Sequence, residues 1–128
     1  ELGRLFSLQG RFERAIDHYE KELELNPDCT PCMSNLAIAL ICIGRVAEGE
    51  GLLKKALSIE EDPFTLYTLG GLYASLNRDA DSLAMLERAA SHRPAWLFEY
   101  LRSDEKFNNI RSNPRFTAVL KFLADASS

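Results

Sequence analysis

The stretch that decides the fold is "MSNLAIALICIGRVAEGEGLLKKALSI", residues 33–59. Its apolar residues recur every three or four positions, which is the spacing of an α-helix with one buried face. They form two stripes on either side of Gly44: Met33, Leu36, Ala37 and Leu40, then Val46, Leu52, Leu53, Ala56, Leu57 and Ile59. The pattern predicts two helices joined by a tight turn.

The same pattern occurs before and after this stretch, at a period of about 34 residues. The positions that agree in residue type are Leu2-Gly3, Leu36-Ala37 and Leu69-Gly70; Phe6, Leu40 and Tyr73; Gly10, Gly44 and Asn77; Ala15, Gly49 and Ser82; and Tyr19, Leu53 and Leu86. A single helix pair cannot bury both of its faces. We therefore expect neighbouring pairs to stack against one another.

Two kinds of position have a direct physical meaning. Gly10 and Gly44 are predicted to end the first helix of their pair, because glycine adopts a left-handed conformation at little cost, and Asn77 is the next most tolerant residue. Small residues are predicted where the two helices of a pair approach closely: Ala15, Gly49 and Ser82. Each repeat is thus expected to be two helices and a turn.

These residues resemble the signature of the tetratricopeptide repeat. The signature is carried by Leu2, Gly3, Phe6, Gly10, Ala15, Tyr19 and Pro27; by Met33, Leu36, Ala37, Leu40, Gly44, Gly49, Leu53 and Ala56; and by Leu66, Leu69, Gly70, Tyr73, Ser82, Ala89 and Pro94. The resemblance implies an all-α, right-handed superhelical solenoid of antiparallel helix pairs. We expect one domain, residues 1–128, with repeats at about 1–29 (partial), 30–62 and 63–94, acting as a protein–protein interaction module or scaffold.

The tail, residues 95–125, leaves the repeat register but keeps a helical pattern, and it is predicted to cap the last apolar face. A helix is expected over residues 95–102, a short one after Asp104, and another that begins at Asn113-Pro114. This segment also resembles the one that follows the last repeat in many bacterial regulatory and sensor proteins. The matching residues are Asp104, Phe107, Ile110, Arg111, Asn113, Pro114, Arg115 and Phe116. The resemblance implies a larger bacterial protein.

Charge and composition limit the choice of partners. The net charge is −4, and Lys and Arg are not clustered, so we expect no nucleic acid partner; an RNA-binding helical repeat remains an alternative, disfavoured by the acidic charge. No apolar run is long enough for membrane insertion. The chain opens on Glu1 rather than Met, which suggests part of a longer protein. An odd number of cysteines favours a reducing compartment, so a cytoplasmic location is expected.

Cys29-Thr30-Pro31-Cys32 is the one motif with a chemical alternative. Read in register, it lies between the first and second repeats, with Cys32 in the first turn of a helix that can lower a thiol pKa. A thiol redox protein using Cys29 and Cys32 is therefore the alternative function, although no strand precedes the motif as in a thioredoxin-type fold. Zinc would need further ligands from Cys42, His18 or His92, and we expect no metal, no cofactor and no catalytic residues.

The resemblance also implies where a partner would bind. In this family the first helix of each pair lines a concave surface, and the corresponding residues are Ser34, Asn35, Ile38, Ile41, Cys42, Phe64, Tyr67, Thr68, Gly71 and Ser75. We expect a peptide or partner protein with apolar anchors there. Two alternatives remain: the C-terminal helices fill part of this surface, or the first helix pairs with a second copy. The basic residues of the family's carboxylate clamp are missing, since Phe64 and Thr68 occupy their places.

Overall fold

The computed structural model describes the backbone of residues 2–127 and the side chains of residues 10–125. Within that range every regular element is a helix, which confirms the predicted all-α fold. The chain divides into two compact units, Glu1–Glu61 and Asp62–Ser128.

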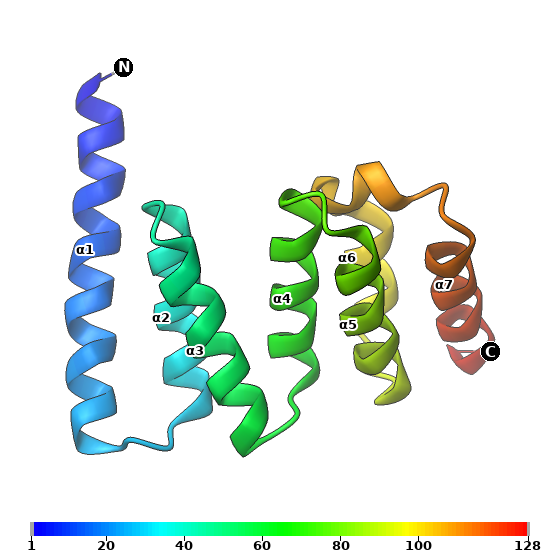
Figure 1. The fold of residues 1–128 in the computed structure, drawn as a ribbon, viewed down its shortest axis with the longest axis horizontal. Coiled ribbons are helices and arrows are strands. Elements are labelled where there is room, and N and C mark those ends of the chain that lie inside the picture. Colours follow the sequence, from blue (N-terminus) through cyan, green and yellow to red (C-terminus); the bar gives the residue numbers. More distant parts are fainter. Residues whose placement is uncertain (1, 128) are drawn as a thin grey trace. The chain divides into compact units, whose positions relative to one another are not determined.

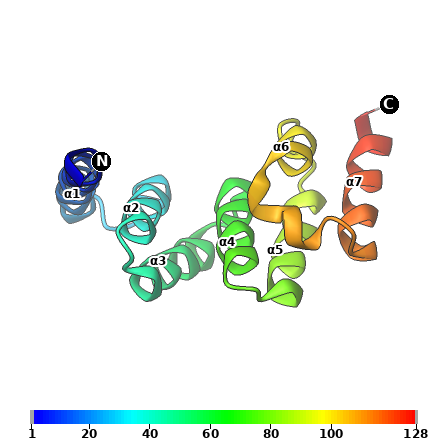
Figure 2. The ribbon, with the colours of Figure 1, turned by 90° about the horizontal axis from the view of Figure 1, so that it is seen from above.

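The first unit contains α1 (Leu2–Leu25), α2 (Thr30–Cys42) and α3 (Val46–Ile59). Helices α2 and α3 pack side by side as an antiparallel pair (Figures 1 and 2). Gly44, at a φ of 92°, makes the turn between them, as predicted. A Cβ on Gly49 would lie 2.5 Å from Cγ1 of Ile41 and 3.0 Å from the carbonyl oxygen of Ala37. The close approach predicted for Gly49 is therefore confirmed.

The first repeat differs from the prediction, because α1 is one continuous helix rather than two helices with a turn at Gly10. Gly10 lies inside this helix, and no atom outside its own turns is within 4 Å of the place where a Cβ would be. Only about two helical turns precede Gly10. Continuing the helix keeps the cooperative backbone hydrogen bonds that a turn would break, so the prediction of a helix end at Gly10 is wrong.

Helix α1 packs on α2 through an apolar stripe from its C-terminal half. Ile16 is buried against Leu36, Ala39 and Leu40 of α2. Half-buried apolar residues surround this group: Phe12, Ala15, Tyr19, Leu23, Ile43 and Leu52. The core of the first unit thus joins all three of its helices, and it leaves one long side of α2 for other contacts.

The second unit contains α4 (Pro63–Ser75), α5 (Asp79–Ser91), α6 (Leu97–Ser103), the 3₁₀ helix η1 (Glu105–Ile110) and α7 (Pro114–Ser127). Helices α4 and α5 form the second antiparallel pair, with Asn77 at a φ of 60° in their turn, as predicted. The hydroxyl of Ser82, which is fully buried, donates a 2.7 Å hydrogen bond to the carbonyl oxygen of Gly70. Ser82 therefore confirms the predicted close approach.

The tail forms the helices that the sequence predicts, with small shifts in their starts. Helix α6 begins at Leu97, two residues later than expected, and Asp104 caps η1 by accepting a 3.0 Å hydrogen bond from the backbone N–H of Lys106. Arg111 ties the segment together, since its guanidinium donates to the carbonyl oxygens of Leu101 and Asp104 at 2.8 and 2.6 Å. Helix α7 then packs against α5 and α6.

Candidate interaction surface

The face of α4 that contains Phe64, Tyr67 and Thr68 is uncharged and partly aromatic. Between Pro63 and Ser75 this helix contains no acidic or basic residue. Phe64 is 40% exposed, and Thr68 is half-buried, with its hydroxyl donating to the carbonyl oxygen of Phe64 at 2.8 Å. Tyr67 is only 7% exposed, although it belongs to the same face. The reason lies in the segment that follows the second helix pair.

Two aromatic residues of the tail lie on this face of α4. The rings of Phe64 and Trp96 have centroids 6.0 Å apart, and Trp96 lies 5.6 Å from Tyr67 and 5.1 Å from Tyr100. The Phe64–Trp96 and Tyr67–Trp96 pairs meet edge to face, a favourable arrangement for aromatic rings. These four residues, Phe64, Tyr67, Trp96 and Tyr100, form the aromatic surface. Its outer rings are accessible, since Phe64 and Tyr100 are 40% and 47% exposed.

Tyr67 packs against η1 and the residue before it. Its ring packs on that of Phe107, which is fully buried, and its hydroxyl donates a hydrogen bond to the carboxylate of Asp104. Burial, together with the Asp104 hydrogen bond, raises the pKa of Tyr67 well above that of a free tyrosine. Burial opposes ionisation of Asp104, but hydrogen bonds from Tyr67 and the Lys106 backbone outweigh it, so the pKa of Asp104 lies below its ordinary value.

The C-terminal helices therefore cover part of the face predicted for a partner. This was the alternative left open by the sequence, and it applies to Tyr67, while Phe64 and Thr68 remain accessible. Sequence reasoning did not assign Trp96, Tyr100 or Asp104 to this face. The signal was present, because Trp96 and Tyr100 are four residues apart, which places both rings on one side of a helix.

The corresponding face of α2, in the first unit, is also uncharged, since Thr30–Cys42 contains no acidic or basic residue. Asn35 and Cys42 are exposed, and Ile38 is half-buried at the centre of the face. Ser34 is buried, and Ile41 lies against Gly49 of α3, so only part of its side chain is accessible. The accessible part of this face is thus small, apolar at Ile38 and polar at Asn35.

The cysteine motif forms a disulfide at the start of α2. Cys29 and Cys32 are bonded, with Cα atoms 5.3 Å apart, and the sulfur of Cys29 accepts a 3.2 Å hydrogen bond from the backbone N–H of Cys32. Cys29 thereby occupies the N-cap position, where a side-chain acceptor satisfies a free helix N–H. Within residues 10–125 no group of three metal-ligating side chains is found, and Cys42 is a free, exposed cysteine.

Comparison with known families matches α1 and the helix pair α2–α3. Residues 1–29 and residues 32–61 each match a tetratricopeptide repeat model. These two segments are tetratricopeptide repeats. Tetratricopeptide repeats generally mediate interactions between proteins, typically as non-catalytic scaffolds. No curated protein matches the chain.

The helix pair α4–α5 has a turn and a close approach like those of α2–α3. Asn77 replaces Gly44 in the turn, and Ser82 replaces Gly49 at the close approach. Along the described part of the chain, no helix is both long enough and apolar enough to cross a bilayer.

Proposed function

We propose that this chain binds a peptide or partner protein on the exposed faces of its inner helices, the side predicted to be concave. The residues proposed for these faces are Ser34, Asn35, Ile38 and Ile41 in the first unit and Phe64, Tyr67 and Thr68 in the second. Ser34 and Tyr67 are buried, so direct contact is proposed for the other five. The two faces lie in different units, and the proposal holds for each by itself. Trp96 and Tyr100 are added to the second face because their rings continue it.

The accessible rings of the aromatic surface are the observation that carries this proposal. Exposed aromatic groups that pack in a fixed arrangement bury a large area on binding at a low cost in side-chain entropy. Because α2 and α4 carry no charge, a partner gains apolar contact and hydrogen bonds rather than ion pairs from them. We therefore propose an uncharged apolar or aromatic segment as the anchor, with binding that changes little with salt.

A peptide selection tests the proposal. A library of random peptides displayed on phage is selected on the immobilised chain, and the recovered peptides are synthesised and titrated while the fluorescence of Trp96, the only tryptophan, is followed. Peptides with uncharged apolar anchors are expected to bind with dissociation constants that shift less than about threefold between 0.1 and 1 M NaCl. Recovery of acidic or basic peptides that dissociate in salt would contradict the proposal.

Matched variants assign the binding to the proposed faces. Phe64→Ala is expected to weaken the peptides that bind the second face, and Ile38→Ala those that bind the first, by tenfold or more, since each removes an apolar anchor of about 1.5–3 kcal/mol. Leu76→Ala and Ile59→Ala serve as controls, because these apolar residues are exposed to a similar degree, 42% and 44%, and lie outside the proposed faces. Equal losses in all variants would point to a nonspecific effect.

The wider setting of the module also belongs to this proposal. We propose that it is a non-catalytic part of a larger bacterial protein, that residues 63–94 are a third repeat and residues 95–125 its cap, and that nucleic acid is not a partner. The sequence predicts a cytoplasmic location. The Cys29–Cys32 disulfide argues against it, because disulfides persist chiefly in oxidising compartments. Fractionation of cells that express the full-length protein tests the location. The alternative role proposed for α1 is pairing with a second copy of the chain, which would be detected as a dimer.

The disulfide keeps one alternative function open, that of a thiol redox protein using Cys29 and Cys32. A bonded Cys-x-x-Cys pair at a helix start can take part in thiol–disulfide exchange, because the helix N-terminus lowers the pKa of a thiol there and the second cysteine can re-form the bond. Both cysteines are half-buried, which limits access to their sulfurs. Alkylation of the reduced chain at several pH values decides between the two functions. A Cys32 thiol no more reactive than free cysteine would end the redox alternative.

A further inference from the structure

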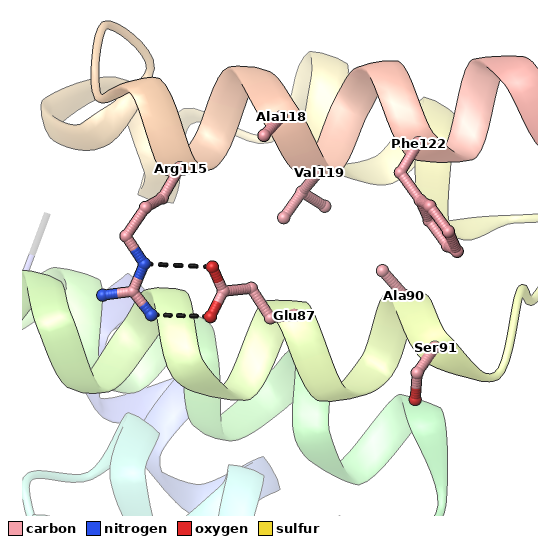
Figure 3. Close-up of a pocket in the computed structure, with 7 residues that line it drawn as sticks. All are labelled: Glu87, Ala90, Ser91, Arg115, Ala118, Val119 and Phe122. Carbon is pink, nitrogen blue, oxygen red and sulfur yellow. Dashed lines mark hydrogen bonds and ion pairs between the residues drawn. The ribbon is translucent and has the colours of Figure 1, made fainter.

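A pocket lies between α5 and α7, away from the residues of the aromatic surface (Figure 3). Its volume is about 250 Å³. Typical small-molecule sites have roughly 300–1,000 Å³, so this pocket suits one side chain rather than a cofactor. Figure 3 shows Glu87 and Arg115 at one end of it and Phe122 at the other.

The pocket exists because small side chains face each other on the two helices. Ala90 and Ser91 come from α5 and Ala118 comes from α7, and larger residues at these places would fill the space. Val119 and Ala90 are nearly buried and form its apolar base. Ser91, Ala118 and Phe122 are exposed, so the pocket opens to solvent.

The polar end of the pocket is neutral. The guanidinium of Arg115 donates two hydrogen bonds to the carboxylate of Glu87, at 3.0 and 2.6 Å. This arginine holds the pKa of Glu87 below its ordinary value. Because Nε and Nη2 of Arg115 already donate to the two carboxylate oxygens of Glu87, the charges of this pair balance at this end of the pocket.

The other end carries a free cation. The guanidinium carbon of Arg93 lies 4.7 Å from the centroid of the Phe122 ring, a cation–π contact that holds it beside the pocket. Arg93 has no ion-pair partner among the residues whose side chains are described. A guanidinium held in this way is ready to receive a carboxylate with little loss of side-chain entropy.

We propose that this pocket is a second binding site, which takes an apolar side chain of a partner protein flanked by an acidic residue whose carboxylate pairs with Arg93. The pocket volume and its Ala90, Val119 and Phe122 walls select the apolar group. Arg93, which contacts the pocket residue Phe122 and has no ion pair within residues 10–125, selects the acidic neighbour by charge complementarity. The site shares no residue with the proposed inner-helix faces, so it can act independently of them.

Two blocked dipeptides test the site: acetyl-Leu-Asp-amide and acetyl-Leu-Asn-amide, which differ only in the carboxylate. Each is titrated into the ¹⁵N-labelled chain while amide chemical shifts are recorded by NMR. We expect shifts in residues 87–93 and 115–122, and about fivefold weaker binding of the asparagine peptide, as for loss of one exposed ion pair. Equal binding of the two peptides, or shifts elsewhere in the chain, would overturn the proposal.

Substitutions test whether the dipeptides bind in the pocket and whether Arg93 gives the preference for aspartate. Ala118→Leu fills the pocket from an exposed position and is expected to abolish both titrations; Ser91→Leu does the same from α5 if the first variant fails to fold. Arg93→Gln is expected to remove the preference for aspartate, while Arg102→Gln, an exposed arginine of α6, keeps it. Leu76→Ala, at an exposed residue outside both proposed sites, leaves both titrations unchanged. Shifts that depend on protein concentration without peptide would assign the pocket to a second copy, against the proposal.

Discussion

The hydroxyl of Tyr67 donates a hydrogen bond to the carboxylate of Asp104, which lies 37 residues further along the chain. This bond joins α4 to the start of η1, and the rings of Trp96, Tyr100 and Phe107 surround the tyrosine. Together these contacts bury Tyr67, while Phe64 and Thr68 on the same helix stay accessible.

Tyr67→Phe keeps the ring and removes this hydrogen bond. Because Asp104 is partly exposed, water can replace the lost donor, and we expect the free energy of unfolding to fall by about 1 kcal/mol. Urea unfolding followed by Trp96 fluorescence measures the change, since this tryptophan lies 5.6 Å from Tyr67. Tyr100→Phe, at a ring that is 47% exposed, is the control and should have almost no effect. Equal losses in both variants would show that the Asp104 bond contributes nothing.

Stability of the second unit should fall in acid. The native pKa values of Asp104 and Glu87 are lowered, so their ionised forms stabilise the folded state above the ordinary pKa of about 4. This contribution is lost as the pH falls from there through the lowered native values. Urea unfolding is measured at pH 7, 5 and 3. Between pH 7 and pH 3 the free energy of unfolding is expected to fall less in Asp104→Asn than in the unaltered chain. When both chains also carry Tyr67→Phe, the difference between them should be smaller, because the hydrogen bond from Tyr67 is part of what lowers the pKa of Asp104.

Gly49→Ala should destabilise the first unit. The added Cβ would lie 2.5 Å from Ile41 and 3.0 Å from the backbone oxygen of Ala37, so α2 and α3 must move apart. We expect a loss of about 1–3 kcal/mol, as for overpacking in other cores. Thermal unfolding followed by circular dichroism measures it.

Gly51→Ala is the matched control for Gly49→Ala, and its effect should have the opposite sign. Gly51 is exposed in the same helix, with no atom within 4 Å of the place where a Cβ would be. Alanine in an open helical position is favoured over glycine by about 0.5–1 kcal/mol. A stabilising Gly49→Ala variant would mean that α2 and α3 are not in close contact.

Reduction of Cys29–Cys32 should loosen the start of α2. The bond closes a short loop, for which the chain-entropy account gives a stabilisation of about 2 kcal/mol. Hydrogen exchange of the α2 amides, measured with and without a phosphine reductant in a Cys42→Ser background, should be faster after reduction. The double variant Cys29→Ser, Cys32→Ser keeps an N-cap hydroxyl and should show no response to the reductant. If the reductant leaves the exchange rates of the α2 amides unchanged in the Cys42→Ser chain, the disulfide does not stabilise the start of α2.

Periodicity predicted the helix pairs because their burial pattern is local. Gly44 and Asn77 adopt the left-handed conformation expected of them, and Gly49 and Ser82 lie at the predicted close approaches. The same reasoning was wrong for Gly10, where glycine permits a turn but does not require one. A turn forms only where packing of the following helix compensates for the broken helical hydrogen bonds.

The sequence alone was enough for the all-α fold, the tetratricopeptide repeats of residues 1–61 and the uncharged helices α2 and α4, since each depends on residue types at a fixed spacing along one helix. Only the tertiary structure decided what covers those helices. The contact of Tyr67 with Asp104, the place of Trp96 beside Phe64, and the pocket between α5 and α7 all join residues far apart in the chain. Such contacts follow from how the tail folds back onto the second unit, which no local pattern encodes.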